Sequence, residues 1–301
     1  MDNCLTTHEG CKKDISGLPH RVLDLREFST VGKIKLVETE GMKDMYACLS
    51  YCWGTDNNFV TTPNNLPVFM TGIPWPDLPQ TYKDAVIVAS KLGIQFLWID
   101  ALCIMQGNKE DPESLKEWEE QSSLMSSIYG NATLTIAATN SRNTHEGFLD
   151  KCKLVEPPLS IPYDHTWLQT EPPEIDHSRS DSWSSNFLRE RAWCYQEYFL
   201  APRVLSFGYE EIAFDCNGGG VCECGQYPSE YDKRRENMKA RDARRISSIG
   251  ISDSLSSVWT TLVTEYSHRR ITFPETRLTV LSGIAQMFQQ KTGTDYLAGH
   301  W

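Results

Sequence analysis

The hydrophobic pattern changes period along the chain, and each change marks a predicted element. Short apolar runs without a helical period occur at residues 45–50, 95–99 and 132–138, and we interpret each as a buried strand. Apolar residues spaced by three and four at 81–92 and 115–129 predict two amphipathic helices between these strands. Alternation of strand and helix builds a parallel sheet with helices on both faces. The predicted fold class is therefore α/β, with a mostly parallel sheet and flanking helices.

Further elements surround this alternating core. Residues 21–25 alternate in polarity and predict an edge strand. A strand at 34–37 is expected to form a hairpin with the one at 45–50 or to lie beside it. Later strands are predicted at 203–207 and 211–216. Later helices are predicted at 189–200, 255–266 and 277–290.

Changes in composition divide the chain into three regions. Residues 1–45 are interpreted as an N-terminal extension, and residues 46–215 as the α/β domain. Residues 140–185 are polar and rich in proline, so we place an insertion of the domain there. Residues 216–301 are expected to form a C-terminal α+β extension packed on the core.

Composition limits the partners and the cellular compartment that we expect for this protein. The net charge of −11 argues against a general nucleic-acid binder, because such proteins neutralise phosphates with Lys and Arg. There is no run of about twenty apolar residues, and the N-terminus lacks the basic and apolar regions of a secretory signal. We therefore expect a soluble cytoplasmic protein without nucleic-acid or membrane partners.

The ten cysteines are too sparse for a disulfide scaffold in a chain of 301 residues, so we expect them to be reduced. Some sit inside apolar runs and are expected to act as small core residues: Cys48, Cys52 and Cys103. The remaining candidates for metal ligands are five cysteines and one histidine: Cys4, His8, Cys11, Cys216, Cys222 and Cys224. Their spacing lacks the paired two-residue gaps of structural zinc sites, so we predict no metal and incidental thiols in a glycine-rich loop.

Aromatic and polar side chains gather where two of the predicted strands end. The strand at 45–50 is followed by Tyr51, Trp53, Gly54 and Asp56, and the strand at 95–99 by Asp100 and Cys103. Open α/β sheets bind ligands at the carboxyl ends of their strands. Aromatic rings there can stack on a ligand, and glycine lets the backbone come close to it. We predict one ligand site at this edge; the alternative is a packed tryptophan at a turn.

Glu120 is the carboxylate predicted to face this site. At roughly 100° per residue, the apolar arc of its helix runs from Leu124 through Ile128 to Tyr129, with Glu119 on the opposite side. Glu120 lies one turn before Leu124 and two turns before Ile128, at the border of the buried face. A carboxylate at that position can point into a crevice. The alternative is an ordinary glutamate on the helix surface.

A third group of hydrogen-bonding side chains lies in the predicted helix at 189–200. It contains Arg191, Trp193 and Gln196 among aromatic residues of the kind usually found in a protein interior. Long polar side chains in such surroundings need partners. We therefore expect these three residues to lie against the same edge of the sheet.

The motifs together resemble those of fungal heterokaryon incompatibility (HET) domain proteins. The matching segments are residues 49–54, 78–85, 97–104 with Gln106, 120–132 and 191–197. The resemblance implies a role in the programmed cell death that follows fusion of genetically unlike hyphae. It also implies a core distantly like that of TIR domains, with a flavodoxin-like arrangement. Some TIR domains cleave NAD with a glutamate on a helix after a sheet strand, which is the place that Glu120 takes here.

Three functions remain in competition. In the first, the chain hydrolyses the nicotinamide–ribose bond of NAD: Glu120 stabilises the developing positive charge, Asp100 orients the ribose or a water, and Tyr51 and Trp53 stack on a ring. NAD or a related nucleotide would then be a substrate, with no tightly bound cofactor. In the second, the chain is a non-catalytic adaptor that associates with itself or with a partner death-signalling protein. The third, a hydrolase using Cys103 and a histidine, lacks any motif pairing the two.

Overall fold

The computed structural model describes most of the chain. The described residues are 2–8, 11, 15–56, 59–107, 112–151, 160–163, 166–169, 187–209, 211–223, 255–271 and 276–293. Cys224 and most of the predicted insertion lie outside them. Among the described helices, none has the length and apolar character needed to cross a membrane.

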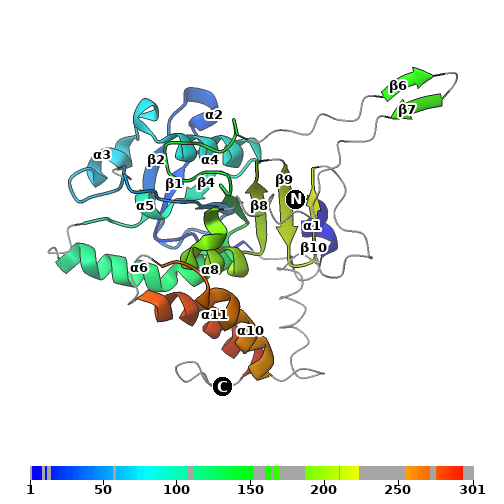
Figure 1. The fold of residues 1–301 in the computed structure, drawn as a ribbon. Helices are drawn as coiled ribbons and strands as arrows, with labels where there is room; N and C mark the ends of the chain where they lie inside the picture. Colours follow the sequence, from blue (N-terminus) through cyan, green and yellow to red (C-terminus); the bar gives the residue numbers. More distant parts are fainter. Residues whose placement is uncertain are drawn as a thin grey trace.

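An eight-stranded mixed sheet organises the molecule (Figure 1). Its strands lie in the order β10-β9-β8-β5-β3-β4-β1-β2. Their bounds are β1 (Arg21–Asp24), β2 (Lys35–Glu38), β3 (Tyr46–Ser50), β4 (Phe96–Trp98), β5 (Leu134–Ala137), β8 (Arg203–Phe207), β9 (Ile212–Cys216) and β10 (Gly219–Cys222). The four central strands β8, β5, β3 and β4 are parallel. A separate two-stranded sheet pairs β6 (Ser160–Tyr163) with β7 (Thr166–Gln169).

The predicted α/β class is confirmed, but the prediction of a mostly parallel sheet is wrong. Four of the seven neighbouring strand pairs are antiparallel, and three are parallel. The antiparallel pairs lie on the two flanks of the sheet. There, short connections join β1 to β2, β8 to β9, and β9 to β10. Connections this short can join antiparallel neighbours but not parallel ones. β1 is also not an edge strand, because β2 covers it, and β2 does not neighbour β3.

Helices cover both faces of the sheet, as the alternating pattern predicted. In Figure 1, α2–α4 lie on one side of the sheet, and α6, α8, α10 and α11 gather on the other. The helix bounds are α1 (Asp2–Thr7), α2 (Phe28–Val31), α3 (Leu66–Thr71), α4 (Gln80–Lys91), α5 (Asp100–Cys103), α6 (Pro112–Asn131), α8 (Ala192–Leu200), α10 (Leu255–Ser267) and α11 (Arg277–Thr292). Short 3-10 turns lie at η2 (Trp75–Asp77) and η3 (Phe187–Glu190).

Side chains along β3 and at its end contact one layer of helices on each face of the sheet. Tyr46 donates to the carbonyl of Ile128 in α6 at 2.6 Å, and Ser50 donates to Glu197 in α8. Tyr51, of the opposite parity, contacts Tyr82 in α4 instead. Successive residues of a strand point to opposite faces, so the end of β3 lies between the two helical layers.

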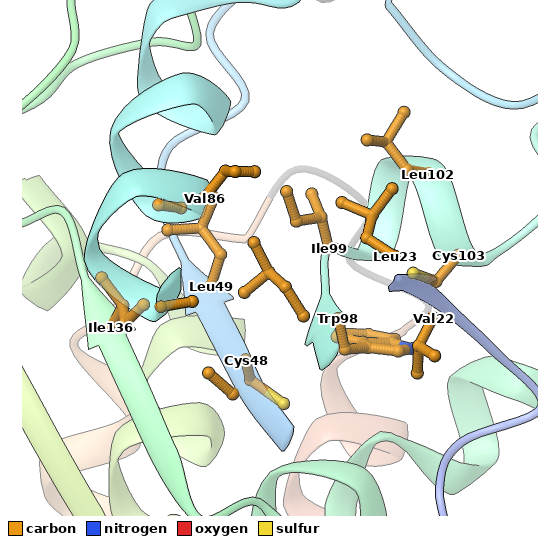
Figure 2. Close-up of a cluster of buried hydrophobic side chains, with 14 of the residues drawn as sticks. Val22, Leu23, Cys48, Leu49, Val86, Trp98, Ile99, Leu102, Cys103 and Ile136 are labelled. Atoms are coloured by element: carbon orange, nitrogen blue, oxygen red, sulfur yellow. The ribbon is translucent and has the colours of Figure 1, made fainter. Parts of the chain in front are cut away.

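The main hydrophobic core lies between the sheet and these helices. Figure 2 shows a part of it, to which β1, β3, β4, β5, α4 and α5 contribute. The labelled side chains are Val22, Leu23, Cys48, Leu49, Val86, Trp98, Ile99, Leu102, Cys103 and Ile136. Burying one such large side chain contributes roughly 1.5–3 kcal/mol, so this core holds the strand ends in place. A second core joins α8 to α10 and α11.

Candidate functional site

Asp100 lies where β4 ends, at the first position of the short helix α5, and it is half-buried. Its Oδ1 accepts hydrogen bonds from the Tyr51 hydroxyl at 2.8 Å and from the backbone N–H of Ala101 at 2.7 Å. Its Oδ2 accepts from the indole N–H of Trp53 at 2.8 Å. The structure therefore brings together three of the predicted site residues, and Asp100 holds the two aromatic side chains in place.

Tyr82 and Arg191 extend this group of side chains. The hydroxyls of Tyr51 and Tyr82 are 2.9 Å apart, and the two rings meet edge to face. Arg191, at the N-terminal boundary of α8, donates from Nη1 to the carbonyl of Tyr51 at 2.9 Å. The expectation that Arg191 lies against this edge is confirmed.

Glu197 in α8 is a second carboxyl group beside the end of β3, and it is only 6% exposed. The Ser50 hydroxyl donates to its Oε2 at 2.5 Å. Burial raises the pKa of Glu197 to about 7, and the charge of Asp100 adds to the rise, while the Ser50 hydrogen bond and the Arg191 charge oppose it. A carboxyl group with this pKa exchanges its proton near neutral pH.

The charges of Asp100, Glu197 and Arg191 influence one another. Burial raises the pKa of Asp100, partly offset by its hydrogen bonds from Tyr51 and Trp53 and by the charge of Arg191. Burial lowers the pKa of Arg191, but nearby thiols and both carboxyl groups outweigh this effect, so that pKa is raised. Arg191 therefore stays cationic. We call Tyr51, Trp53, Asp100, Arg191 and Glu197 the carboxyl-edge cluster.

The carboxyl-edge cluster combines groups that suit proton transfer and the binding of an anion. Glu197 supplies a titrating carboxyl group, and Arg191 supplies a fixed positive charge. Groups with perturbed pKa values that converge at one place are candidates for a functional site. The location, at the carboxyl ends of parallel strands, is also where open α/β sheets bind their ligands.

Glu120 lies in α6, but not at the border of its buried face. Its side chain is 60% exposed, and its carboxylate is 3.9 Å from the ammonium of Lys116. Leu124, one turn later, is 47% exposed, whereas Gln121 and Ser122 are buried. The premise that Glu120 borders the apolar face is therefore wrong, because the neighbouring helices cover the Gln121 side of α6. A catalytic role for Glu120 stays a prediction.

Three other predicted site residues, Gly54, Asp56 and Cys103, have surroundings that do not indicate a ligand-binding role. Gly54 has a positive φ of 75°, and a Cβ there would come within 2.5 Å of the Asn143 Cβ, so close chain packing requires glycine. Asp56 is exposed. Cys103 is buried in the main core, and burial raises its thiol pKa to about 12, which disfavours the nucleophilic thiolate.

The remaining two predicted residues are packed on the helical side. Trp193 is half-buried and contacts both the main core and the core formed with α10 and α11. Gln196 is 4% exposed, and a Cβ on Gly283 of α11 would come within 2.0 Å of its Nε2. Gln196 therefore faces the C-terminal helices, and the expectation that its side chain lies against the carboxyl edge of the sheet is wrong, because α11 packs on that side of α8.

Sequence reasoning did not select Glu197 or Ser50. A usable signal was present, because Glu197 is the only charged residue in the segment Ala192–Leu200, which is apolar or aromatic apart from Gln196. A charged residue inside such a segment is almost never buried unless it has partners, so it deserves to be treated as a site candidate. Ser50 carries no comparable signal.

Comparison with known proteins agrees with the motifs. A family model described as heterokaryon incompatibility protein (HET) matches residues 46–197, which is half of the chain. A search of curated proteins and a search of solved structures find no match. The matched segment begins at the first residue of β3 and ends at Glu197, so it contains the whole carboxyl-edge cluster. The chain belongs to the heterokaryon incompatibility (HET) family.

Proposed function

We propose that this chain is a cell-death effector domain that hydrolyses the nicotinamide–ribose bond of NAD at the carboxyl edge of its sheet. One observation carries the proposal: Asp100, bonded to Tyr51, and Glu197, bonded to Ser50, are two carboxyl groups with raised pKa values at that edge, where the Arg191 guanidinium donates to the Tyr51 carbonyl. The similarity of HET domains to TIR domains that cleave NAD adds support by analogy alone.

The reaction consumes NAD and water and releases ADP-ribose, nicotinamide and a proton. Breaking the bond gives the ribose oxocarbenium character, which a nearby carboxylate stabilises. We assign that role to Glu120. Because a carboxylate that is 60% exposed is well solvated, Glu120 becomes effective only when bound substrate or a second copy of the chain covers it.

The carboxyl-edge cluster has supporting roles in this proposal. Asp100 already accepts three hydrogen bonds, so it holds the half-buried Trp53 for stacking on a ring of the substrate, while Tyr51, only 4% exposed, supports Asp100 from the core. Arg191 contributes positive charge toward the phosphates. Glu197, with a pKa of about 7, receives or returns the proton of the attacking water.

The test compares two adjacent glutamates in α6. Glu120→Gln keeps size and hydrogen-bonding capacity and removes only the charge. Removing one electrostatic group that acts in the transition state commonly lowers kcat on the order of a hundred- to a thousand-fold. Glu119→Gln, also on the exposed surface, is the matched control and should retain activity. Equal rates of nicotinamide release by the two variants eliminate Glu120 as the catalytic group.

A second function, a non-catalytic self-associating adaptor, is favoured by a different observation. Both oxygens of Asp100 are already engaged by Tyr51, Trp53 and Ala101, as in a polar network that only stabilises the fold. This function predicts oligomers in light scattering and no nicotinamide at any protein concentration.

A further inference from the structure

The N-terminal helix and the β9–β10 hairpin bring four potential metal ligands together. Cys4 and His8 are four residues apart, and the N–H of His8 donates to the carbonyl of Cys4 at 3.2 Å, so both lie on one side of a helical turn. Cys11 follows after a turn in which its N–H donates to the carbonyl of His8 at 3.0 Å. Cys216, the last residue of β9, completes the group from far along the chain.

The separations suit a tetrahedral ion. One ligand atom from each of the four residues lies within 4.8 Å of all the others, and the Cys216 Sγ is 3.3 Å from the His8 Nδ1. Zinc bound at its usual distances places two sulfurs about 3.8 Å apart and a sulfur and a nitrogen about 3.6 Å apart. Small side-chain adjustments therefore bring all four atoms to bonding distance.

Arg203 provides an independent reason to expect negative charge here. It is 1% exposed, and it is the cross-strand partner of Cys216, so the two side chains share a face of the sheet. Its guanidinium donates to the carbonyls of Cys11 and Thr133, and among the described residues no ion pair with a carboxylate is found for it. A buried cation needs a countercharge. Three thiolates and a neutral imidazole around Zn²⁺ carry a net charge of −1, which balances Arg203.

We propose that Cys4, His8, Cys11 and Cys216 bind one Zn²⁺ as a structural site. Three cysteines and one histidine supply all four tetrahedral positions, which is typical of structural zinc, whereas catalytic zinc keeps one position open. The three cysteines are at most 5% exposed, so the site is closed to substrate.

The position of the site defines what the ion stabilises. Arg203 is the first residue of β8, which runs parallel to β3, so the four ligands lie at the opposite edge of the sheet from the carboxyl-edge cluster. The ion ties the N-terminal residues to the turn between β9 and β10. Gly218 in that turn lies against the imidazole, since a Cβ there would come within 2.5 Å of the His8 Nδ1.

Metal analysis of the purified full chain tests the proposal. Protein from cells supplied with zinc should contain about one zinc per chain by mass spectrometry, and Co²⁺ replacing it should give the visible absorption of a tetrahedral thiolate complex. Cys216→Ser should lose most of this metal. Cys222→Ser is the matched control, because Cys222 is also a buried cysteine of the hairpin but lies outside the group, and it should keep the metal.

A third variant separates loss of the metal ligand from simple misfolding. His8→Cys should still bind one ion and should strengthen the sulfur-to-cobalt charge-transfer absorption, because a fourth thiolate replaces the imidazole. Wild-type protein that contains no zinc and gives no cobalt spectrum overturns the proposal. Equal metal content in Cys216→Ser and wild type, or a disulfide between two of the three cysteines, also overturns it.

Discussion

Replacing Glu197 by glutamine is expected to change how folding stability depends on pH. The folded protein holds the Glu197 proton up to a pKa of about 7, whereas the ordinary value is 4.5. Between these values the folded state binds a proton that the unfolded state releases. The stabilisation from this group is therefore complete below about pH 4.5 and is lost as the pH rises through about 7. Glutamine cannot titrate, so Glu197→Gln removes this dependence.

The folded and unfolded pKa values of Glu197 determine how much this group contributes to the unfolding free energy. Their difference corresponds to roughly 3 kcal/mol over the full range, at about 1.4 kcal/mol for each tenfold change in proton affinity. Of this, roughly 2 kcal/mol falls between about pH 5.5 and pH 8, because the folded group is mostly protonated at the lower pH and ionised at the higher. The side chain is only 6% exposed, so solvent screening does not reduce the effect greatly.

Urea unfolding followed by tryptophan fluorescence at several pH values measures this effect. The wild type should lose roughly 2 kcal/mol more unfolding free energy than Glu197→Gln between about pH 5.5 and pH 8. Glu119→Gln removes an exposed carboxylate and should follow the wild type. Parallel curves for the wild type and Glu197→Gln would refute the buried, proton-holding state of Glu197.

Two further predictions concern the loop after β3. Tyr51→Phe removes the hydroxyl that donates to Asp100 and should lower the unfolding free energy by about 1–3 kcal/mol; an unchanged urea midpoint would show that this hydrogen bond contributes nothing. Gly54→Ala combines a positive φ with a clash against Asn143 and should cost roughly 2–5 kcal/mol, whereas Gly93→Ala, with nearly the same φ but open space, should cost only about 1–2 kcal/mol. Equal melting temperatures for the two alanine variants would contradict the close packing at Gly54.

The hydrophobic period predicted the central elements because it reports local burial. The strands predicted at 45–50, 95–99 and 132–138 correspond to β3, β4 and β5, and the helices between them are present. The period does not report strand direction. Whether two strands run parallel depends on the connection between them, so the antiparallel flanks of the sheet were missed.

The sequence did not predict that Glu120 is exposed and Glu197 is buried, and the reason is similar. A helical wheel gives the angle between residues of α6, but not which neighbours cover each angle. Contacts of α6 with α8 and α11 accompany the burial of Gln121 and Ser122 and leave Leu124, which the pattern placed in the apolar arc, exposed. Helix α8 is short and covered on most sides, so Glu197 is buried although it is charged.

The carboxyl-edge cluster was partly predictable because chain order places strand ends together. Tyr51, Trp53 and Asp100 each follow a strand of the parallel centre, and such ends meet at one edge. The sequence indicated Cys4, His8, Cys11 and Cys216 among six candidate metal ligands, but it did not predict that these four meet, because Cys216 reaches the N-terminal helix only through the pairing of β9 with β8.

Incubating the purified wild-type chain with NAD, at increasing protein concentration, tests the proposed hydrolysis most directly. Free nicotinamide and ADP-ribose are quantified by chromatography over time. The account predicts that both products appear in equal amounts, at a rate per chain that rises where self-association covers Glu120. NAD that remains intact at every protein concentration would contradict hydrolysis at the carboxyl edge of this HET domain.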